Sequence, residues 1–294
     1  MGGGGSPGST QPAPPTSRGR RVTLSALAIR SRKRGRGDAP LVMVTAYDEP
    51  SARYADEAGV DVILVGDSVA NVVMGHEDTL HVTVDDMCHH VRAVAAARPR
   101  AHVVADLPWL SYHLGVNESV RNAAALVRAG AQSVKLEGGR VRLAVVRALL
   151  DAEIPVMGHL GLTPQSVLAF GGFKVQAKTR EAAEAITLDA VALQDEGVYA
   201  IVIEGVPSLV GTHVTHALTI PTIGIGAGPD TDGQVLVWHD LLGLSGRTPA
   251  KFVRRYADLG AATVEALRHY AEDVRAGTFP NESETYANPD GLFD

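Results

Sequence analysis

The chain has 294 residues, of which 45% are hydrophobic, so it can bury one large α/β core. Its formal net charge of −6 disfavours nucleic acid as a partner, because polyanion binding needs a basic surface. No segment reaches the roughly 18 uninterrupted apolar residues of a membrane helix, so we expect no membrane partner. The single cysteine, Cys88, excludes an intrachain disulfide and fits a reducing compartment.

Both ends of the chain are polar. Residues 1–21 are mostly glycine, proline, serine and threonine, which predicts a disordered tail, because so few apolar groups cannot offset the entropy of ordering. Residues 22–280 carry the periodic apolar pattern of a single folded domain. Residues 281–294 are polar again and predict a loosely ordered C-terminal tail.

Short apolar runs alternate with helical patterns along the whole domain. Runs without polar alternation are typical of parallel strands that are covered on both faces. The predicted strands are 41–45, 61–66, 102–106, 132–137, 154–158, 199–203, 222–225 and 235–238. Their alternation with helices predicts an α/β fold of the (β/α)8 TIM-barrel type.

Helix signals separate these strands. The first helix is short, with Thr23 as its expected N-cap. Later helices are expected after residues 46–48 and through 58, from 83, at 117–129, 140–150 and 180–196, within 206–218, and at 251–257 and 260–275. Asp85 and Asp86 fall in the first turn of the helix that begins near Thr83, where carboxylates favour the helix dipole. Cys88, His89 and His90 follow, but adjacent helical residues point about 100° apart, so we expect no metal site there.

Four predicted strands end in an acidic residue: Asp67, Asp106, Glu137 and Glu204. Parallel barrels carry their active sites at the carboxyl ends of the strands, so these acids are the candidate site. If Asp67, Asp106 and Glu137 project toward one point, a cation has to lie among them. Oxygen-only ligands, completed by water and substrate oxygens, favour magnesium over zinc.

Lys135 precedes Glu137 by two residues and so points to the same face of its strand. A lysine inside a barrel needs a partner, which is a substrate carboxylate, Glu137, or a purely structural ion pair. Glu204 comes from the far side of the barrel. In an apolar pocket its proton affinity would rise, which suits a general base that removes a proton beside a carbonyl polarised by the ion.

Two loops complete the candidate site. Residues 159–176 form a long connection at the strand-end face, which predicts a lid or binding loop. The glycine-rich segment 224–228 follows the seventh strand. It is interpreted either as a phosphate site or as a tight turn whose lack of side chains leaves room at the active site.

Six segments together resemble the ketopantoate hydroxymethyltransferase family, and they occur in order between about residues 23 and 280. The segments are TAYD (45–48), VGDS (65–68), ADLP (105–108), VKLEGG (134–139), GHLGLTPQS (158–166) and IGIGAG (223–228). Motifs of this length and number are far more specific than a lone glycine pattern.

The resemblance implies a transferase of pantothenate biosynthesis. It would add the one-carbon unit of 5,10-methylenetetrahydrofolate to 3-methyl-2-oxobutanoate and give 2-dehydropantoate, through a magnesium-stabilised enolate. It also implies a homodecamer of (β/α)8 barrels in the cytoplasm. Carried over by position, the magnesium ligands are Asp67, Asp106 and Glu137, the oxo-acid contacts are Asp67, Ser68, Asp106 and Lys135, and the proton acceptor is Glu204.

The chain departs from the family pattern at several positions. His81 stands where a proline is common, Gly205 where a larger residue is usual, and Ala177-Lys178 replaces a common Gly-Arg pair. The tail after Pro280 lacks the usual His-Ser ending. These departures concern loops and oligomer contacts, because none replaces an acidic site residue.

Two competing interpretations remain. A magnesium-dependent lyase or mutase of the related enolate-forming barrels would also place acids at strand ends, but such enzymes often use a reactive loop cysteine, and Cys88 lies on a predicted helix. A binding protein on an inactive barrel would have no reason to keep four acids there, since unpaired buried charges are destabilising.

Overall fold

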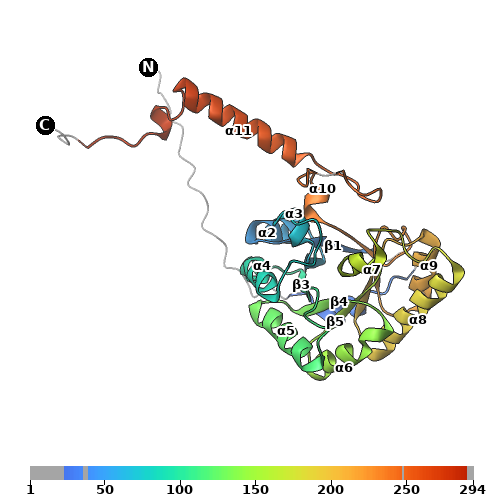
Figure 1. The fold of residues 1–294 in the computed structure, drawn as a ribbon. Helices are drawn as coiled ribbons and strands as arrows, with labels where there is room; N and C mark the ends of the chain where they lie inside the picture. Colours follow the sequence, from blue (N-terminus) through green and yellow to red (C-terminus); the bar gives the residue numbers. More distant parts are fainter. Residues whose placement is uncertain (1–22, 36–38, 247, 290–294) are drawn as a thin grey trace, which may run out of the picture.

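The computed structural model describes residues 23–35, 39–246 and 248–289. In this part of the chain, parallel strands close into a barrel in the order β1 to β8, with helices around the outside (Figure 1), so the predicted (β/α)8 fold is confirmed. The strands are β1 (Leu41–Thr45), β2 (Val62–Val65), β3 (His102–Asp106), β4 (Ser133–Glu137), β5 (Val156–Gly161), β6 (Ala200–Glu204), β7 (Thr222–Ile225) and β8 (Gly233–Leu236). The predicted tail at 1–21 lies outside the described residues, as does 290–294.

Helices connect successive strands, and short 3-10 turns introduce some of them. The helices are α1 (Ala26–Arg30), α2 (Glu49–Glu57), α3 (Val69–Val72), α4 (Val84–Ala96), α5 (Val116–Ala129), α6 (Leu143–Asp151), α7 (Val167–Phe170), α8 (Arg180–Glu196), α9 (Ser208–Ala217), α10 (Trp238–Leu241) and α11 (Leu259–Ala276). The 3-10 turns are η1 (Arg140–Arg142), η2 (Pro164–Ser166) and η3 (Glu282–Glu284). None of the helices in the described chain is long and apolar enough to cross a membrane.

Strand alternation divides the core into two layers. Outward-facing residues such as Val134 and Leu136 of β4 pack under the helices, while inward-facing residues such as Val104, Met157 and Val202 fill the barrel. Successive side chains of a strand point to opposite faces. The odd-numbered positions of β4 therefore face inward together, which places Lys135 and Glu137 inside the barrel.

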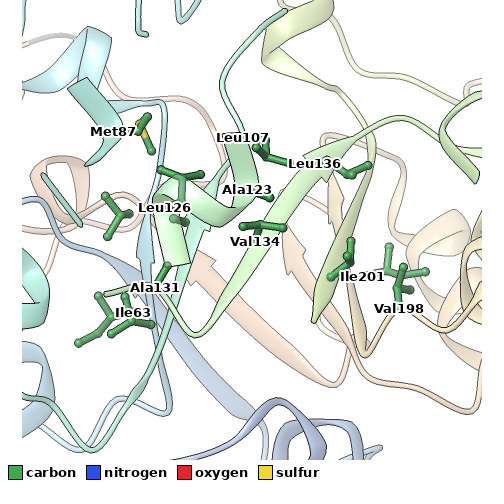
Figure 2. Close-up of a cluster of buried hydrophobic side chains, with 14 of the residues drawn as sticks. Ile63, Met87, Leu107, Ala123, Leu126, Ala131, Val134, Leu136, Val198 and Ile201 are labelled. Carbon is green, nitrogen blue, oxygen red and sulfur yellow. The ribbon is translucent and has the colours of Figure 1, made fainter. Parts of the chain in front are cut away.

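The outer layer holds the helices against the sheet. Figure 2 shows Ala123 and Leu126 of α5 beside Leu107 and Val134. Leu126 and Val134 are completely buried. Burying a leucine side chain stabilises the fold by about 1.5–3 kcal/mol, so this layer fixes the strands whose ends carry the acids.

Helix α1 closes the amino end of the barrel. Ile29 is fully buried in the inner layer, and His102 Nδ1 donates to Leu24 O at 3.0 Å. His102 Nε2 contacts Ser133 Oγ at 2.7 Å, and Ser133 Oγ contacts Tyr199 OH at 2.8 Å. These contacts fill the amino end of the barrel interior.

Several predicted boundaries were wrong. Helix α1 is capped by Ser25, which accepts from Ala28 N at 3.1 Å, and not by Thr23, because the chain is still extended at Ser25. Residues 251–257 form turns and not the expected helix. Strand β8 begins two residues early, at Gly233, since its pairing with β1 starts there.

The start of α4 agrees with the dipole interpretation of its acids. Thr83 Oγ1 accepts from Asp86 N, and Asp86 Oδ2 accepts from Thr83 N, which is a reciprocal capping box. Cys88 is buried on the same helix, and burial raises the pKa of its thiol. The thiol is therefore a poor nucleophile at neutral pH.

Helix α11 extends away from the barrel in Figure 1, and none of its residues is buried. Exposed large apolar side chains recur along it at intervals of three to five residues: Leu259, Val264, Leu267, Tyr270 and Val274. Such spacing puts most of them on one face of the helix. Phe279 packs its ring against Tyr270 at a centroid distance of 5.5 Å, and the apolar side chains of this face still remain exposed in the described chain.

Candidate active site

Two acidic side chains meet where β2 and β3 end. The chain turns at Gly66, and Asp67 then donates its backbone N–H to Asp106 Oδ2 at 3.0 Å. A Cβ atom on Gly66 would lie 2.8 Å from Ser68 Oγ and 3.4 Å from Asp106 Oδ2. The missing side chain therefore permits the turn that brings Asp67 beside Asp106.

Lys135 supplies a buried positive charge. Its Nζ lies 2.7 Å from Asp106 Oδ1, and both side chains are at most 5% exposed. Burial disfavours the ammonium form, but the charges of Asp106, Glu137 and Asp67 outweigh it and raise the pKa of Lys135. The register of β3 and β4 pairs Asp106 with Lys135, so the ion pair is made with Asp106 and not with Glu137.

The acids outnumber this cation. Burial, and then the negative charges of Asp106 and Glu137, raise the pKa of Asp67 well above its usual range, although Lys135 and Gln165 oppose the shift. A carboxylate in this position is poorly compensated by the protein alone. A further cation at this point would relieve the repulsion.

Gln165 connects acids from two strands. Its backbone N–H donates to Glu137 Oε2 at 3.0 Å, and its side-chain Nε2 donates to Asp67 Oδ2 at 2.9 Å. Gln165 lies in η2 and is buried. The start of the connection between β5 and α8 is therefore part of the site, which agrees with its expected role as a binding loop.

His159 lies between the remaining two carboxylates. Its Nδ1 is 3.3 Å from Glu137 Oε1 and 3.3 Å from Lys135 Nζ, and its Nε2 is 3.1 Å from Glu204 Oε2, though out of line for a hydrogen bond. Burial and Lys135 lower the pKa of His159, but the interactions with Glu137 and Glu204 outweigh them and raise it to about 9. The two flanking carboxylates therefore favour the protonated imidazole, while Lys135 opposes it.

Ser68 stands at the rim of the same site. Tyr47 OH and Ser68 Oγ lie 2.9 Å apart, and Tyr47 is buried. Burial raises the pKa of the Tyr47 phenol, so the hydroxyl stays protonated. It can therefore donate to Ser68 and hold that hydroxyl in place.

These side chains line one cavity of about 90 Å³ inside the upper barrel. Its polar walls are Asp67, Ser68, Asp106, Lys135, Glu137, His159 and Glu204, and its apolar walls include Leu64, Val202, Ile225 and Val235. Larger hollows lie near α1 and near Asp232, away from the strand-end acids. The small cavity with convergent charged groups suits a compact, polar ligand.

The acidic side chains Asp67, Asp106 and Glu137 can supply some, but not all, of the ligands of a hard cation. Among the described residues, no group of three histidine, cysteine or acidic side chains is placed to hold one metal ion by itself. Magnesium commonly uses one or two carboxylates and completes its shell with water and substrate oxygens. Asp67 and Asp106 are adjacent, and no hydrogen bond from the described residues reaches Asp67 Oδ1, so the donor set suits such an open site.

The glycine-rich segment after β7 supports the tight-turn interpretation. Gly226 has a φ of +61°, and a Cβ atom there would lie 2.7 Å from the ring of Phe252. A Cβ atom on Gly224 would lie 2.6 Å from Thr231 Oγ1. Neighbouring side chains therefore occupy the space that a phosphate would need beside these glycines.

The structure brings all the sequence-predicted site residues to this one cavity. Sequence reasoning gave no role to His159, Gln165 or Tyr112. His159 could have been found from strand alternation, because it pairs in register with Glu137 on the neighbouring strand. Gln165 and Tyr112 lie in loops, where no periodic signal gives the direction of a side chain.

A closed parallel barrel with buried acids, a lysine and a histidine at the carboxyl ends of its strands defines a barrel enzyme. The profile of the ketopantoate hydroxymethyltransferase family matches residues 21–282. The 3-methyl-2-oxobutanoate hydroxymethyltransferase of Moorella thermoacetica is 52% identical over 267 residues, which cover 90% of this chain and 98% of the relative. The enzyme of that name from a Methylobacterium species is 56% identical over 252 residues, covering 86% and 88%.

The chain therefore belongs to the ketopantoate hydroxymethyltransferase family and is a hydroxymethyl-transferring enzyme. Solved structures of lower similarity share the fold. A phosphonopyruvate hydrolase complex with oxalate and Mg²⁺ superposes with a TM-score of 0.58 at 14% identity, covering 90% of this chain and 92% of that one. A 2,3-dimethylmalate lyase gives 0.56 at 19% identity, with coverage of 90% and 92%.

Proposed function

We propose that the enzyme transfers the one-carbon unit of 5,10-methylenetetrahydrofolate to 3-methyl-2-oxobutanoate and gives 2-dehydropantoate, a step of pantothenate biosynthesis. The family match supports the reaction class. The observation that carries the proposal is the single cavity with a lysine and paired acids on one side and Glu204 on the other. This arrangement suits a small 2-oxo acid that loses a proton beside its carbonyl.

We propose that Asp67, Asp106 and Glu137 hold Mg²⁺, with water and substrate oxygens completing its shell. When bound, the ion supplies electrophilic polarisation of the substrate's carbonyl oxygen. The excess of buried acids over Lys135 supports a cation at this place. Asp67 and Asp106 form the adjacent pair, and water can connect an ion to Glu137.

Asp67, Ser68, Asp106 and Lys135 are the proposed oxo-acid contacts. Lys135 is the buried cation suited to the substrate carboxylate, and the hydroxyl of Ser68 can donate to one of its oxygens. The apolar wall of Val202 and Ile225 suits the branched end of the substrate. These contacts would place the C3–H bond toward Glu204.

Glu204 is the proposed base. Its carboxylate takes the C3 proton, and the electron pair of the C–H bond moves toward the carbonyl oxygen and gives an enolate. C3 then forms a bond to the methylene carbon of the folate, and both bonds from that carbon to the folate nitrogens break with their electron pairs left on nitrogen. Water provides the hydroxyl oxygen, the C3 proton and the two protons of water end on the new hydroxyl and the two nitrogens, and tetrahydrofolate leaves. The structure places His159 beside Glu204, so the base is not surrounded by apolar groups alone.

We also propose the cytoplasmic homodecamer that the family resemblance implies. The exposed apolar stripe of α11 supports association with further copies of the chain. A large apolar face without cover in the monomer is typical of an oligomer contact.

The decisive experiment incubates the purified protein with 3-methyl-2-oxobutanoate, magnesium and the folate donor, and follows 2-dehydropantoate by mass spectrometry. Product should require all three components. A lyase or mutase of the related barrels would instead convert a 2-oxo acid without folate. The buried, non-nucleophilic Cys88 and the family match both argue against that alternative.

A further inference from the structure

Gln165 is held rigidly at the entrance to the connection between β5 and α8. It lies in the 3-10 turn η2, where Ser166 N donates to Thr163 O at 2.9 Å and Thr163 Oγ1 donates to Ser166 Oγ at 2.9 Å. The side chain of Gln165 is 6% exposed. A short turn of this kind fixes both the backbone N–H and the origin of the side chain.

The hydrogen bonds of the Gln165 side-chain amide determine which of its two flipped orientations is present. Both Nε2 hydrogens are used, one toward Asp67 Oδ2 at 2.9 Å and one toward Leu107 O at 3.0 Å. Oε1 accepts from Tyr112 OH at 2.6 Å. A flipped amide would bring its oxygen against two other acceptors, so the donor side of Gln165 faces Asp67.

Tyr112 links Gln165 to the end of β4 through hydrogen bonds. Its hydroxyl oxygen accepts from the backbone N–H of Glu137 at 3.2 Å, and the ring is 1% exposed. Gln165 N donates to Glu137 Oε2 at 3.0 Å. Two loop residues therefore constrain Glu137 at its backbone and at its carboxylate, while one of them also constrains Asp67.

We propose that Gln165 is a positioning residue for the magnesium site: its amide holds Asp67 Oδ2 and its backbone holds Glu137 Oε2. Asp67 Oδ1, which no hydrogen bond from the described residues reaches, is then presented to the cation. This inference rests on the proposed function. Outer-shell hydrogen bonds that orient ligands commonly change metal affinity by about 10- to 100-fold when removed.

The test measures binding of Mn²⁺ alone, as a spectroscopic substitute for Mg²⁺, by electron paramagnetic resonance without substrate. Gln165→Met keeps the length of the side chain and the backbone bond to Glu137 but removes the bond to Asp67. We expect its Kd for Mn²⁺ to rise at least about tenfold. Gln165→Asn, whose shorter amide cannot reach Asp67, should show a rise in the same direction.

The matched control is Gln176→Met, the same substitution in the same connection. The Gln176 side chain donates to Lys174 O at 2.8 Å, and among the described residues no hydrogen bond or ion pair links it to an acid of the site. Its Kd should equal that of the wild type. Thermal unfolding is measured with and without Mn²⁺, because a metal that binds the folded state raises Tm according to its affinity.

A positioning role predicts a smaller Mn²⁺-dependent rise in Tm for Gln165→Met than for the wild type. Equal Kd values in the folded Gln165 variants and the wild type would overturn the proposal. So would a Tm that falls equally with and without Mn²⁺, since that is the result of a purely structural role. A wild type that does not bind Mn²⁺ would refute the magnesium proposal itself, and the positioning role with it.

Discussion

His159 Nε2 lies 3.1 Å from Glu204 Oε2, while the other ring nitrogen lies 3.3 Å from Glu137 Oε1. One imidazole thus joins the proposed base to a proposed metal ligand. Both carboxylates favour the protonated form of His159, and a protonated ring would partly neutralise each of them. A substitution at Glu204 or Glu137 will therefore change the electrostatic environment of the other carboxylate through His159. Experiments that separate their roles have to preserve the contact with His159.

Asp106→Asn should weaken binding of both magnesium and the oxo acid. The amide oxygen can still accept from Asp67 N, but the charge that pairs with Lys135 at 2.7 Å is lost. We expect the Mg²⁺ Kd to rise by more than the roughly 100-fold seen for outer-shell changes. Titration calorimetry measures both ligands, with the exposed Asp195→Asn as control. Unchanged oxo-acid affinity would argue against a bridging ion.

Stability should fall in mild acid because of His102. Burial, opposed only by the contact with Leu24 O, lowers the pKa of His102 to about 4. The unfolded chain takes up a proton near pH 6.5 and the folded chain does not, so this stabilisation is complete above pH 6.5 and is lost as the pH falls toward 4. Between pH 7.5 and 5 the loss is about 2 kcal/mol.

Urea unfolding of the wild type, His102→Gln and the exposed control His89→Gln at both pH values checks this expectation. The loss between the two pH values should be smaller by about 2 kcal/mol in His102→Gln and unchanged in His89→Gln. If all three proteins lose the same stability, then His102 is not the group responsible.

The positions of the strands and of their acids could be predicted from the sequence, because burial on both faces leaves a plain apolar run that ends at a charged residue. Strand alternation also assigned Lys135 and Glu137 to one face. The site's hydrogen bonds could not be predicted. Gln165 reaches Asp67 across 98 positions of the chain, and that contact depends on how two loops fold over the barrel.

The predicted ends of helices and strands are wrong where two local sequence signals compete. Thr23 and Ser25 are both good N-caps, and only the packing of α1 under the barrel selects Ser25. The predicted fifth strand ends at Gly158, which leaves His159 in the connection that follows. In the structure Gly158 lies inside β5, where a Cβ atom would be 3.0 Å from the Leu193 side chain, so the glycine serves helix packing and the strand continues.

Leu126→Ala should destabilise the barrel through the helix–sheet layer of Figure 2. Leu126 is completely buried on α5, so the truncation leaves a cavity and costs about 2–5 kcal/mol. Leu209→Ala on α9 is the control, since Leu209 is 82% exposed. Denaturant unfolding measures both. A loss at Leu126 no greater than at Leu209 would mean that α5 does not pack as described.

Leu267→Glu on α11 should reduce self-association. A charge in the middle of the exposed apolar stripe disfavours burial against another copy, because an unpaired buried carboxylate is costly. Sedimentation velocity should show the wild type as a large oligomer and the variant as smaller species. Val141→Glu changes an even more exposed apolar residue elsewhere and should leave the mass unchanged. A monomeric wild type would refute the oligomer proposal.

Glu204→Gln should remove the proton transfer while the site stays assembled. The amide keeps nearly the same volume, and its oxygen can still face His159 Nε2, so substrate and metal should bind as before. We expect the rate to fall by about 10²- to 10⁴-fold, the usual contribution of a positioned general base.

The clearest assay omits folate and follows exchange of the substrate's C3 proton with deuterated water by NMR. The wild type with magnesium should exchange this proton, and the variant should not. Glu137→Gln is the matched comparison, because it makes the same change on the other side of His159. If Glu204→Gln exchanges at the wild-type rate while Glu137→Gln, with metal bound, does not, the base lies on β4 and the two carboxylates have the opposite roles.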